Sequence, residues 1–280
     1  MATFYNTASL SYGGQVTNSN TTEAELSSGL TLTKSAITET YGAGGSLVYA
    51  VTLTNAGSSA YEALTLTDDL GAYPVPGGTA TVRPLTYVEG SLRYYLNGVL
   101  QEPPAVTADD GLTVTGISVP ALGTATLLYE TQANGLAPIA AGSSITNTAS
   151  VGELTASSTV TAAEAPQLTI AKAVCPATLT DGGELTYTLI VQNLGNTPID
   201  ATDGLTVSDL FSPILTDLTV TLDGAPLSEG TGYTYDGATG AFTTLDGAIA
   251  VPAASYLQDP ESGVITTTPG VAVLTVTGTV

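Results

Sequence analysis

Apolar residues alternate with threonine or serine along many short segments of the chain. Clear examples are residues 47–54, 64–67, 125–131, 185–191, 218–222 and 272–277. A period of two is typical of a strand with one buried face, and the β-branched residues that dominate these segments favour strands. No window shows sustained helical periodicity with capping residues. The sequence therefore predicts an all-β chain.

Turn residues divide these segments at short intervals. Asn97-Gly98 and Asp223-Gly224 each stand between alternating stretches, which is the pattern of a two-residue hairpin. Many short strands separated by Gly, Pro and Asp are typical of immunoglobulin-like β-sandwiches. The cysteine pair and tryptophan of antibody domains are missing, so this prediction concerns architecture alone.

An internal repeat divides the chain into two predicted domains. Its two lysines, Lys34 and Lys172, open matching segments, LTLTKSAITETYGAGGSLVYAVTLTNAG and LTIAKAVCPATLTDGGELTYTLIVQNLG. In each copy a tyrosine follows the lysine by 15 residues, at Tyr49 and Tyr187. We expect one immunoglobulin-like domain at residues 30–163 and another at 167–280, joined by a short linker around 162–166.

The two copies differ at their ends. The first continues into ITNTASV, which contains Asn147, whereas the second has no such segment before Val280. A near-copy, FYNTASL, begins instead at Phe4. We therefore predict that the second domain is incomplete and accepts a strand from residues 1–12, with 13–29 as a flexible connector. The predicted donor-strand residues are Phe4, Tyr5, Asn6, Thr7, Ala8, Ser9 and Leu10.

Composition excludes several classes of function. A net charge of −21 repels phosphate and anionic lipid, so we expect no nucleic-acid binding, and no apolar run is long enough to insert into a membrane. The chain has no histidine, and we expect no metal, no cofactor and no turnover enzyme. The single cysteine, Cys175, cannot form an internal disulfide and is expected to be a small buried residue at a strand end.

The repeated motifs carry a family resemblance. The lysine segment, the glycine pair, the Asn-x-Gly turn and the TNTA segment resemble a bacterial surface-protein repeat known as domain of unknown function eleven. They also resemble the isopeptide-forming domains of Gram-positive pili and adhesins, in which a buried acid assists a lysine–asparagine bond. The resemblance implies roles for Lys34, Asp68 and Asn147 in the first domain. In the second it implies Lys172 and Asp209, with Asn6 as the asparagine supplied from elsewhere.

The proposed chemistry also follows from the residue types. Burial favours a neutral, nucleophilic lysine amine and a neutral carboxyl that can donate a proton. The amine can then attack the asparagine carboxamide and release ammonia. Two alternatives remain at this level: the pairs could be ordinary salt bridges, and Asp69 competes with Asp68 as the assisting acid.

The leading functional hypothesis is a self-assembling structural subunit. Identical subunits would join head to tail through the donor strand and form an extracellular, bacterial cell-surface filament locked by isopeptide bonds. Self-insertion of the donor strand is a rival arrangement. A stalk or ligand-binding module of an adhesin, without covalent polymerisation, is the alternative function. The N-terminus lacks the pattern of a secretory signal, so the export route stays open.

Overall fold

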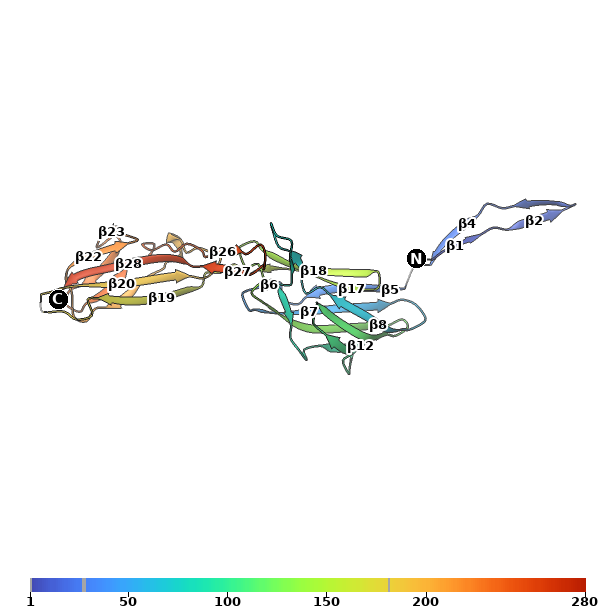
Figure 1. Ribbon diagram of the computed structural model, residues 1–280, viewed down its shortest axis with the longest axis horizontal. Helices are drawn as coiled ribbons and strands as arrows, with labels where there is room; N and C mark the ends of the chain where they lie inside the picture. Colours follow the sequence, from blue (N-terminus) through green and yellow to red (C-terminus); the bar gives the residue numbers. More distant parts are fainter. Residues whose placement is uncertain (1, 27–28, 181) are drawn as a thin grey trace.

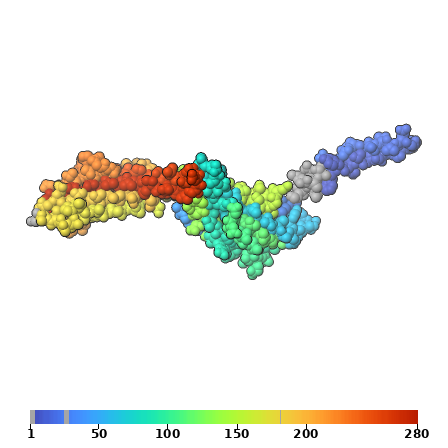
Figure 2. All heavy atoms as spheres, in the orientation of Figure 1, coloured from blue at the N-terminus to red at the C-terminus, as the bar shows by residue number. Residues whose placement is uncertain are grey.

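The computed structural model describes residues 2–26, 29–180 and 182–280, and strands dominate all three ranges (Figure 1). Among these residues the one helical element is a 3-10 turn, η1 (Ala201–Asp203). The prediction of an all-β chain is confirmed. Two sandwiches and an N-terminal hairpin make up an elongated molecule (Figure 2).

The first sandwich, residues 30–162, has two large sheets. Its strands are β5 (Leu30–Ala36), β6 (Thr40–Tyr41), β7 (Ser46–Asn55), β8 (Tyr61–Asp68), β9 (Tyr73–Pro74), β10 (Thr81–Val82), β11 (Leu85–Tyr87), β12 (Arg93–Leu96), β13 (Val99–Gln101), β14 (Ala105–Thr107), β15 (Leu112–Val119), β16 (Thr124–Ala133), β17 (Ser144–Val151) and β18 (Leu154–Ala162). One sheet has the order β13-β12-β16-β7-β5, with β11 also pairing with β16. The other has the order β14-β15-β8-β17-β18-β6, and β9 pairs with β10.

The second sandwich, residues 168–280, repeats part of this plan. Its strands are β19 (Leu168–Cys175), β20 (Glu184–Asn193), β21 (Ser208–Leu210), β22 (Thr216–Leu222), β23 (Ala225–Leu227), β24 (Tyr233–Asp236), β25 (Ala241–Thr244), β26 (Ser255–Gln258), β27 (Ile265–Thr268) and β28 (Gly270–Thr279). One sheet has the order β19-β20-β28-β22-β23, and the smaller one has the order β21-β25-β24. Strands β26 and β27 form a separate hairpin.

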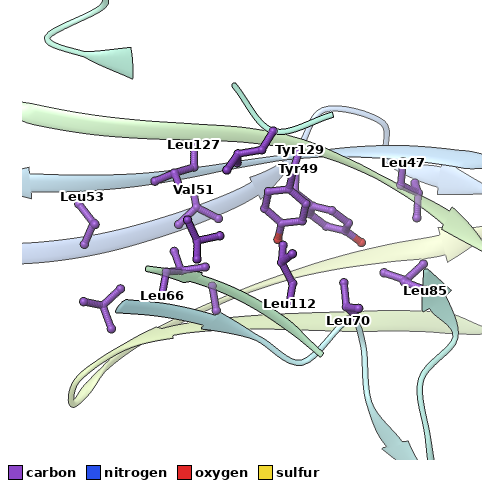
Figure 3. Close-up of a cluster of buried hydrophobic side chains, with 14 of the residues drawn as sticks. Leu47, Tyr49, Val51, Leu53, Leu66, Leu70, Leu85, Leu112, Leu127 and Tyr129 are labelled. Atoms are coloured by element: carbon purple, nitrogen blue, oxygen red, sulfur yellow. The ribbon is translucent and has the colours of Figure 1, made fainter. Parts of the chain in front are cut away.

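The alternating pattern explains these strands and their cores. All six segments identified from the sequence lie in strands, namely β7, β8, β16, β20, β22 and β28. Each sandwich has its own buried apolar cluster, and Figure 3 shows part of the first, including Leu47, Leu66 and Leu127. Both predicted hairpins are present: Leu96 pairs with Val99 across Asn97-Gly98, and Leu222 pairs with Ala225 across Asp223-Gly224.

The N-terminal segment is a hairpin of four strands, β1 (Ala2–Asn6), β2 (Ser9–Tyr12), β3 (Gln15–Asn18) and β4 (Thr22–Leu26). Strand β1 pairs with β4, and β2 pairs with β3. Residues 15–18 and 22–26, which belong to the predicted flexible connector over 13–29, therefore lie in paired strands. The turn residues Gly13 and Gly14 adopt positive φ angles of 60° and 79°, which glycine accommodates without strain and which fold the chain back on itself.

A clasp connects the two sandwiches, formed by the β26–β27 hairpin lying against β9 and β10 of the first sandwich. The amide Nε2 of Gln258 donates to the hydroxyl of Tyr73 at 2.6 Å, and the backbone N–H of Ile265 donates to the Gly135 carbonyl at 3.3 Å. An ideal Cβ on Gly78 would lie 1.9 Å from the Pro260 carbonyl oxygen, so the backbones touch there. The corresponding loop of the first sandwich is short and forms no such hairpin among the described residues.

Cys175 is exposed, contrary to the expectation that it is buried. It stands at the end of β19, a strand with one hydrogen-bonded neighbour among the described residues. The inward positions of β19 are those of Lys172 and Val174, so strand alternation directs Cys175 to the outer face of the sheet.

Candidate functional site

The first sandwich holds a buried lysine–aspartate pair that bridges its two sheets. The Nζ of Lys34, from β5, lies 2.5 Å from Oδ2 of Asp68, from β8, and both side chains are fully buried. Burial lowers the pKa of Lys34, and the nearby Asp68 carboxylate opposes this shift. The pair thus combines an amine biased towards its neutral form with an acid in direct contact.

Asp69 does not share this position. Its Oδ1 accepts hydrogen bonds from the backbone N–H groups of Gly71 and Thr148, both at 2.9 Å. Asp69 follows the last residue of β8, and its carboxylate is engaged by these backbone donors. Of the two candidate acids, Asp68 is the one that contacts Lys34.

Two tyrosines form one wall of this site. The hydroxyl of Tyr129 donates to Asp68 Oδ2, and the ring of Tyr129 stacks on that of Tyr49 with centroids 5.8 Å apart. The Nζ of Lys34 lies 4.8 Å from the centre of the Tyr49 ring, within range of a cation–π contact. In Figure 3 both hydroxyls point across the core towards the opposite sheet. Sequence reasoning missed Tyr129, because the second copy has Val276 at the corresponding place.

Asn147 is buried beside this group. Its Oδ1 accepts a hydrogen bond of 3.1 Å from the Gly71 N–H, while Asp68 Oδ1 accepts one of 3.0 Å from the preceding N–H, that of Leu70. Two consecutive backbone donors therefore hold the amide and the carboxyl next to each other. The Nδ2 of Asn147 has no hydrogen-bond partner in the described part of the chain.

The arrangement suits attack on a carboxamide. A backbone N–H aimed at the amide oxygen stabilises the negative charge that develops there during nucleophilic attack. Burial raises the pKa of Tyr129 well above its ordinary value, and the Asp68 charge adds to that rise. The hydroxyl thus keeps its proton and can remain a donor to Asp68.

The second sandwich holds a similar pair in an open setting. The Nζ of Lys172 lies 2.5 Å from Asp209 Oδ2, with 39% of the lysine side chain and 15% of the aspartate side chain exposed. The rings of Tyr187 and Phe211 flank the ammonium at 4.2 Å and 5.3 Å. Within residues 168–180 and 182–280, no asparagine contacts this pair.

The exposure has a structural cause. In the first sandwich, β17 pairs with β8, and β18 then covers β5. In the second, β21 corresponds to β8 and β19 to β5, yet β21 pairs with β25 alone and β19 with β20 alone among the described strands. The edge between them is open, and the inward side chains of Ile170 and Val174 are about half exposed.

Two cavities mark this open edge, one on each side of Lys172. The first has a volume of about 330 Å³, and the second about 520 Å³. The first cavity is lined by Leu168, Ile170, Val191, Leu205 and Val207. The second is lined by Val174, Leu179, Leu185, Tyr187, Pro213 and Val280. An apolar groove with unpaired backbone at its rims is suited to receiving extra strands.

The remaining predicted site residue, Asn6, lies on the N-terminal hairpin and is exposed. Figure 1 shows this hairpin beyond the first sandwich, on the side away from the second. The fold therefore assembles Lys34, Asp68 and Asn147, and separately Lys172 and Asp209, but one molecule does not bring Asn6 to Lys172. The apolar hairpin side chains Phe4, Leu10 and Tyr12 are exposed as well.

No cluster of three or more potential metal-ligating side chains occurs among the described residues. None of the described helices has the length and apolarity needed to cross a membrane.

Comparisons with known proteins give the following matches. No family model and no curated protein matches the chain. The pilus backbone protein RrgB of Streptococcus pneumoniae matches 86% of this chain and 55% of its own, with 11% identity and a TM-score of 0.35. The major pilins BcpA of Bacillus cereus and SpaD of Corynebacterium diphtheriae match 87% and 85% of this chain, and 66% and 58% of their own. Their identities are 13% and 12%, and both TM-scores are 0.33.

This chain therefore spans about half to two thirds of these pilins. With every TM-score below 0.5, the functional argument rests on the chain's own residues. The resemblance to the surface-protein repeat family stays a prediction.

Proposed function

We propose that this chain is a structural subunit that polymerises head to tail outside a bacterial cell. The N-terminal donor strand of one subunit, within residues 1–12, completes the second sandwich of the next. One observation carries the proposal: the hairpin presents Asn6 opposite Thr22 on a paired strand, as β17 presents Asn147 opposite Ser158, while the Lys172–Asp209 pair contacts no amide side chain among the described residues.

The first covalent step joins Lys34 to Asn147 within one subunit. The neutral Lys34 amine attacks the Asn147 side-chain carbonyl carbon, and the Gly71 N–H supports the developing oxyanion. A new C–N bond forms, the bond to Nδ2 breaks, and ammonia leaves after proton transfer through Asp68. An amine and a carboxamide held in contact reach an effective molarity on the order of 10⁵ M or more, enough for a single turnover.

The second step joins Lys172 of one subunit to Asn6 of its neighbour by the same chemistry. The incoming strand supplies the carboxamide and covers the Lys172–Asp209 pair from solvent. The outcome is one internal and one intersubunit amide bond per subunit, with one ammonia released for each.

Self-insertion is disfavoured by the pairing of the hairpin. Strand β4 ends at Leu26 and β5 begins at Leu30, so three residues connect them. In the paired hairpin Asn6 lies opposite Thr22, and the eight residues from Thr22 to Leu30 reach at most about 26–29 Å, whereas a ten-residue strand such as β7 alone is about 33 Å long. An intact hairpin thus cannot pass the first sandwich to reach Lys172 of its own chain. The contact is heterologous, and such contacts build open fibres unless a ring closes.

The test is the mass distribution of the full-length protein after boiling in denaturant with reductant. The expected result is a ladder of multiples of the subunit mass. Each multimer should be lighter than the sum of its subunits by one ammonia for every internal bond and one for every bond between neighbouring subunits. Asn6→Ala should leave monomer lighter by one ammonia. A monomer of unmodified mass would contradict both bonds and support the alternative of a stalk or adhesin module without covalent polymerisation.

A further inference from the structure

Two hairpins of the chain are built to the same plan. In the first sandwich, β17 and β18 pair so that Asn147 is opposite Ser158, and the next pair outward is Thr148 with Ser157, whose hydroxyl oxygens are 3.0 Å apart. In the N-terminal hairpin the same step from Asn6 places Thr7 beside Thr21, whose hydroxyl oxygens are 2.9 Å apart. The likeness thus includes the second strand of each hairpin.

The apolar faces of the two hairpins also correspond. On β17 the buried residues at two-residue steps around Asn147 are Ile145, Ala149 and Val151. At the same steps around Asn6 the residues are Phe4, Ala8 and Leu10, and here 56% of Phe4 and 69% of Leu10 are exposed. Across the hairpin, Val160 is opposite Ile145, while Ala24 is opposite Phe4. Phe4 is larger than its counterpart Ile145, and Ala24, which faces Phe4, is smaller than its counterpart Val160.

The second strand has a defined place in the complete sandwich. Strand β18 lies against β5, where the Ala36 N–H donates to Ser158 Oγ at 2.9 Å, and it continues in parallel beside β6. Two strands, rather than one, therefore fill the space between β8 and β5. By repeat spacing, the residue that corresponds to Ala36 is Val174 on β19.

We propose that the donor is the whole hairpin of a second copy of this chain, seated with both strands between β21 and β19. Strand β1 and the residues after it run along β21, and β4 runs along β19. The register of the first sandwich, with Ala149 opposite Asp68, places Ala8 opposite Asp209. The inference rests on the proposed function and replaces a single donor strand by a two-stranded one.

The two cavities of the open edge fit this register. The antiparallel offset that pairs Ala8 with Asp209 places Leu10 at Val207, in the cavity of about 330 Å³. It places Phe4 at Pro213, in the cavity of about 520 Å³. Phe4 of β1 and Leu10 of β2 thus meet the two apolar hollows, with Asn6 between them at Lys172. The polar face, which carries Thr7 and Thr21, remains towards solvent.

A disulfide cross-link to the native cysteine tests the position of β4. In the first sandwich, Ser158 contacts Ala36, and the next residue on each strand is Thr159 and Ile37. Thr159 and Ile37 are both exposed on the outer face. Their counterparts are Glu23 of the donor and Cys175 of the acceptor, which should lie on adjacent strands within disulfide reach. Glu23→Cys is made in the full-length Asn6→Ala background, which lacks the intersubunit amide acceptor, and the protein is treated with a mild thiol oxidant.

The expected result is a ladder of multimers that reductant collapses to monomer, with a linked peptide joining positions 23 and 175. Tyr5→Cys in the same background is the matched control, because Tyr5 is the cross-strand partner of Glu23 and lies one strand further from β19. Its ladder should be at least tenfold weaker. Glu23→Cys with Cys175→Ser should stop at dimers.

The failures are distinguishable. A wild-type amide ladder together with no Glu23→Cys disulfide, or with a stronger Tyr5→Cys ladder, would overturn the two-stranded seat and leave the proposed polymerisation intact. A Glu23→Cys ladder without any wild-type amide ladder would support the hairpin seat and contradict the intersubunit bond. Absence of both ladders would overturn both proposals.

Discussion

Lys172 Nζ lies as close to Asp209 Oδ2, at 2.5 Å, as the fully buried Lys34 lies to its aspartate, yet 39% of the Lys172 side chain is exposed. The second ion pair is therefore formed without the covering strands that bury the first. Within residues 168–180 and 182–280 it contacts no asparagine, and in the proposed assembly the N-terminal hairpin supplies both the amide and the cover. Pre-formed contacts of this kind reduce the reorganisation required when the partner arrives.

Asn147→Ala should eliminate the internal bond. After correction for the mass change of the substitution itself, the monomer should not show the one-ammonia mass deficit of the internal bond. Because a cross-link between residues 34 and 147 closes a loop of about 100 residues, its loss should lower the free energy of unfolding by about 4–5 kcal/mol. Intact mass and urea denaturation measure the two effects.

Thr148→Ala is the matched control for that substitution, since it removes an outward hydroxyl from the neighbouring position. It should retain the mass loss and change stability by less than about 1 kcal/mol. If Asn147→Ala has the same mass deficit as the wild type, Asn147 is not the acceptor.

Tyr129→Phe should slow formation of the internal bond without preventing folding. The substitution removes the hydroxyl that donates to Asp68 and keeps the ring that stacks on Tyr49. Because Tyr129 acts only through Asp68, we expect about a 10- to 100-fold decrease in rate, less than the roughly 10²–10⁴-fold that a direct general acid or base contributes. The rate is measured as the loss of ammonia from newly synthesised chain over time.

Tyr94→Phe serves as the control, because Tyr94 is also a buried tyrosine of the first sandwich and donates instead to the Ser118 carbonyl. It should leave the rate unchanged. Equal slowing in both variants would attribute the effect to general loosening of the sandwich and not to contact with Asp68.

The sequence was sufficient for the main strands and reached the site partly through the family resemblance. Alternation revealed β7, β16, β20 and β28, the repeat spacing matched the two lysines, and the resemblance implied Asp68, which lies against Lys34. Tyr129 was missed because its role depends on a cross-core contact that the second copy lacks. The strands at residues 15–26 were missed because their alternation is largely between polar residues, and the pairing becomes evident only when Gly13-Gly14 is placed at the turn.

The pH dependence of stability should reveal Lys34 when it cannot react. In Asn147→Ala the lysine stays free, and burial makes its pKa lower in the folded state than in the unfolded one. Between the folded pKa and the unfolded pKa, the unfolded state binds more protons, so stability rises with pH. The unfolding midpoint should therefore increase with pH up to about pH 9, below the range in which unfolded tyrosines, with a pKa of about 10, ionise.

Lys34→Met combined with Asn147→Ala removes the titrating group and should flatten this dependence. The wild type should also lack it, because its Nζ is consumed in an amide. An equal slope in all three proteins would assign the dependence to other groups and contradict the lowered pKa of Lys34.

Gly78→Val should open the joint between the sandwiches and leave each sandwich folded. A Cβ at this position would lie 1.9 Å from the Pro260 carbonyl oxygen, so the β26–β27 hairpin must move away from β9 and β10. Displacement also costs the hydrogen bond of Gln258 to Tyr73, and we expect the clasp to weaken by about 1–3 kcal/mol. Small-angle scattering should show a broader distribution of shapes, and proteases should cut faster between residues 162 and 166.

Gly135→Ala is the matched control, because its carbonyl also lies in the joint while a Cβ there meets nothing within 4 Å. It should leave scattering and proteolysis unchanged. If Gly78→Val behaves in the same way, the clasp does not stiffen the subunit. If it loosens the joint as expected, the clasp stiffens the joint between the two sandwiches of one subunit. The described strands of the first sandwich include no counterpart of β26–β27, so the joint made by the donated hairpin has no such clasp. A filament should therefore bend at the joint between subunits.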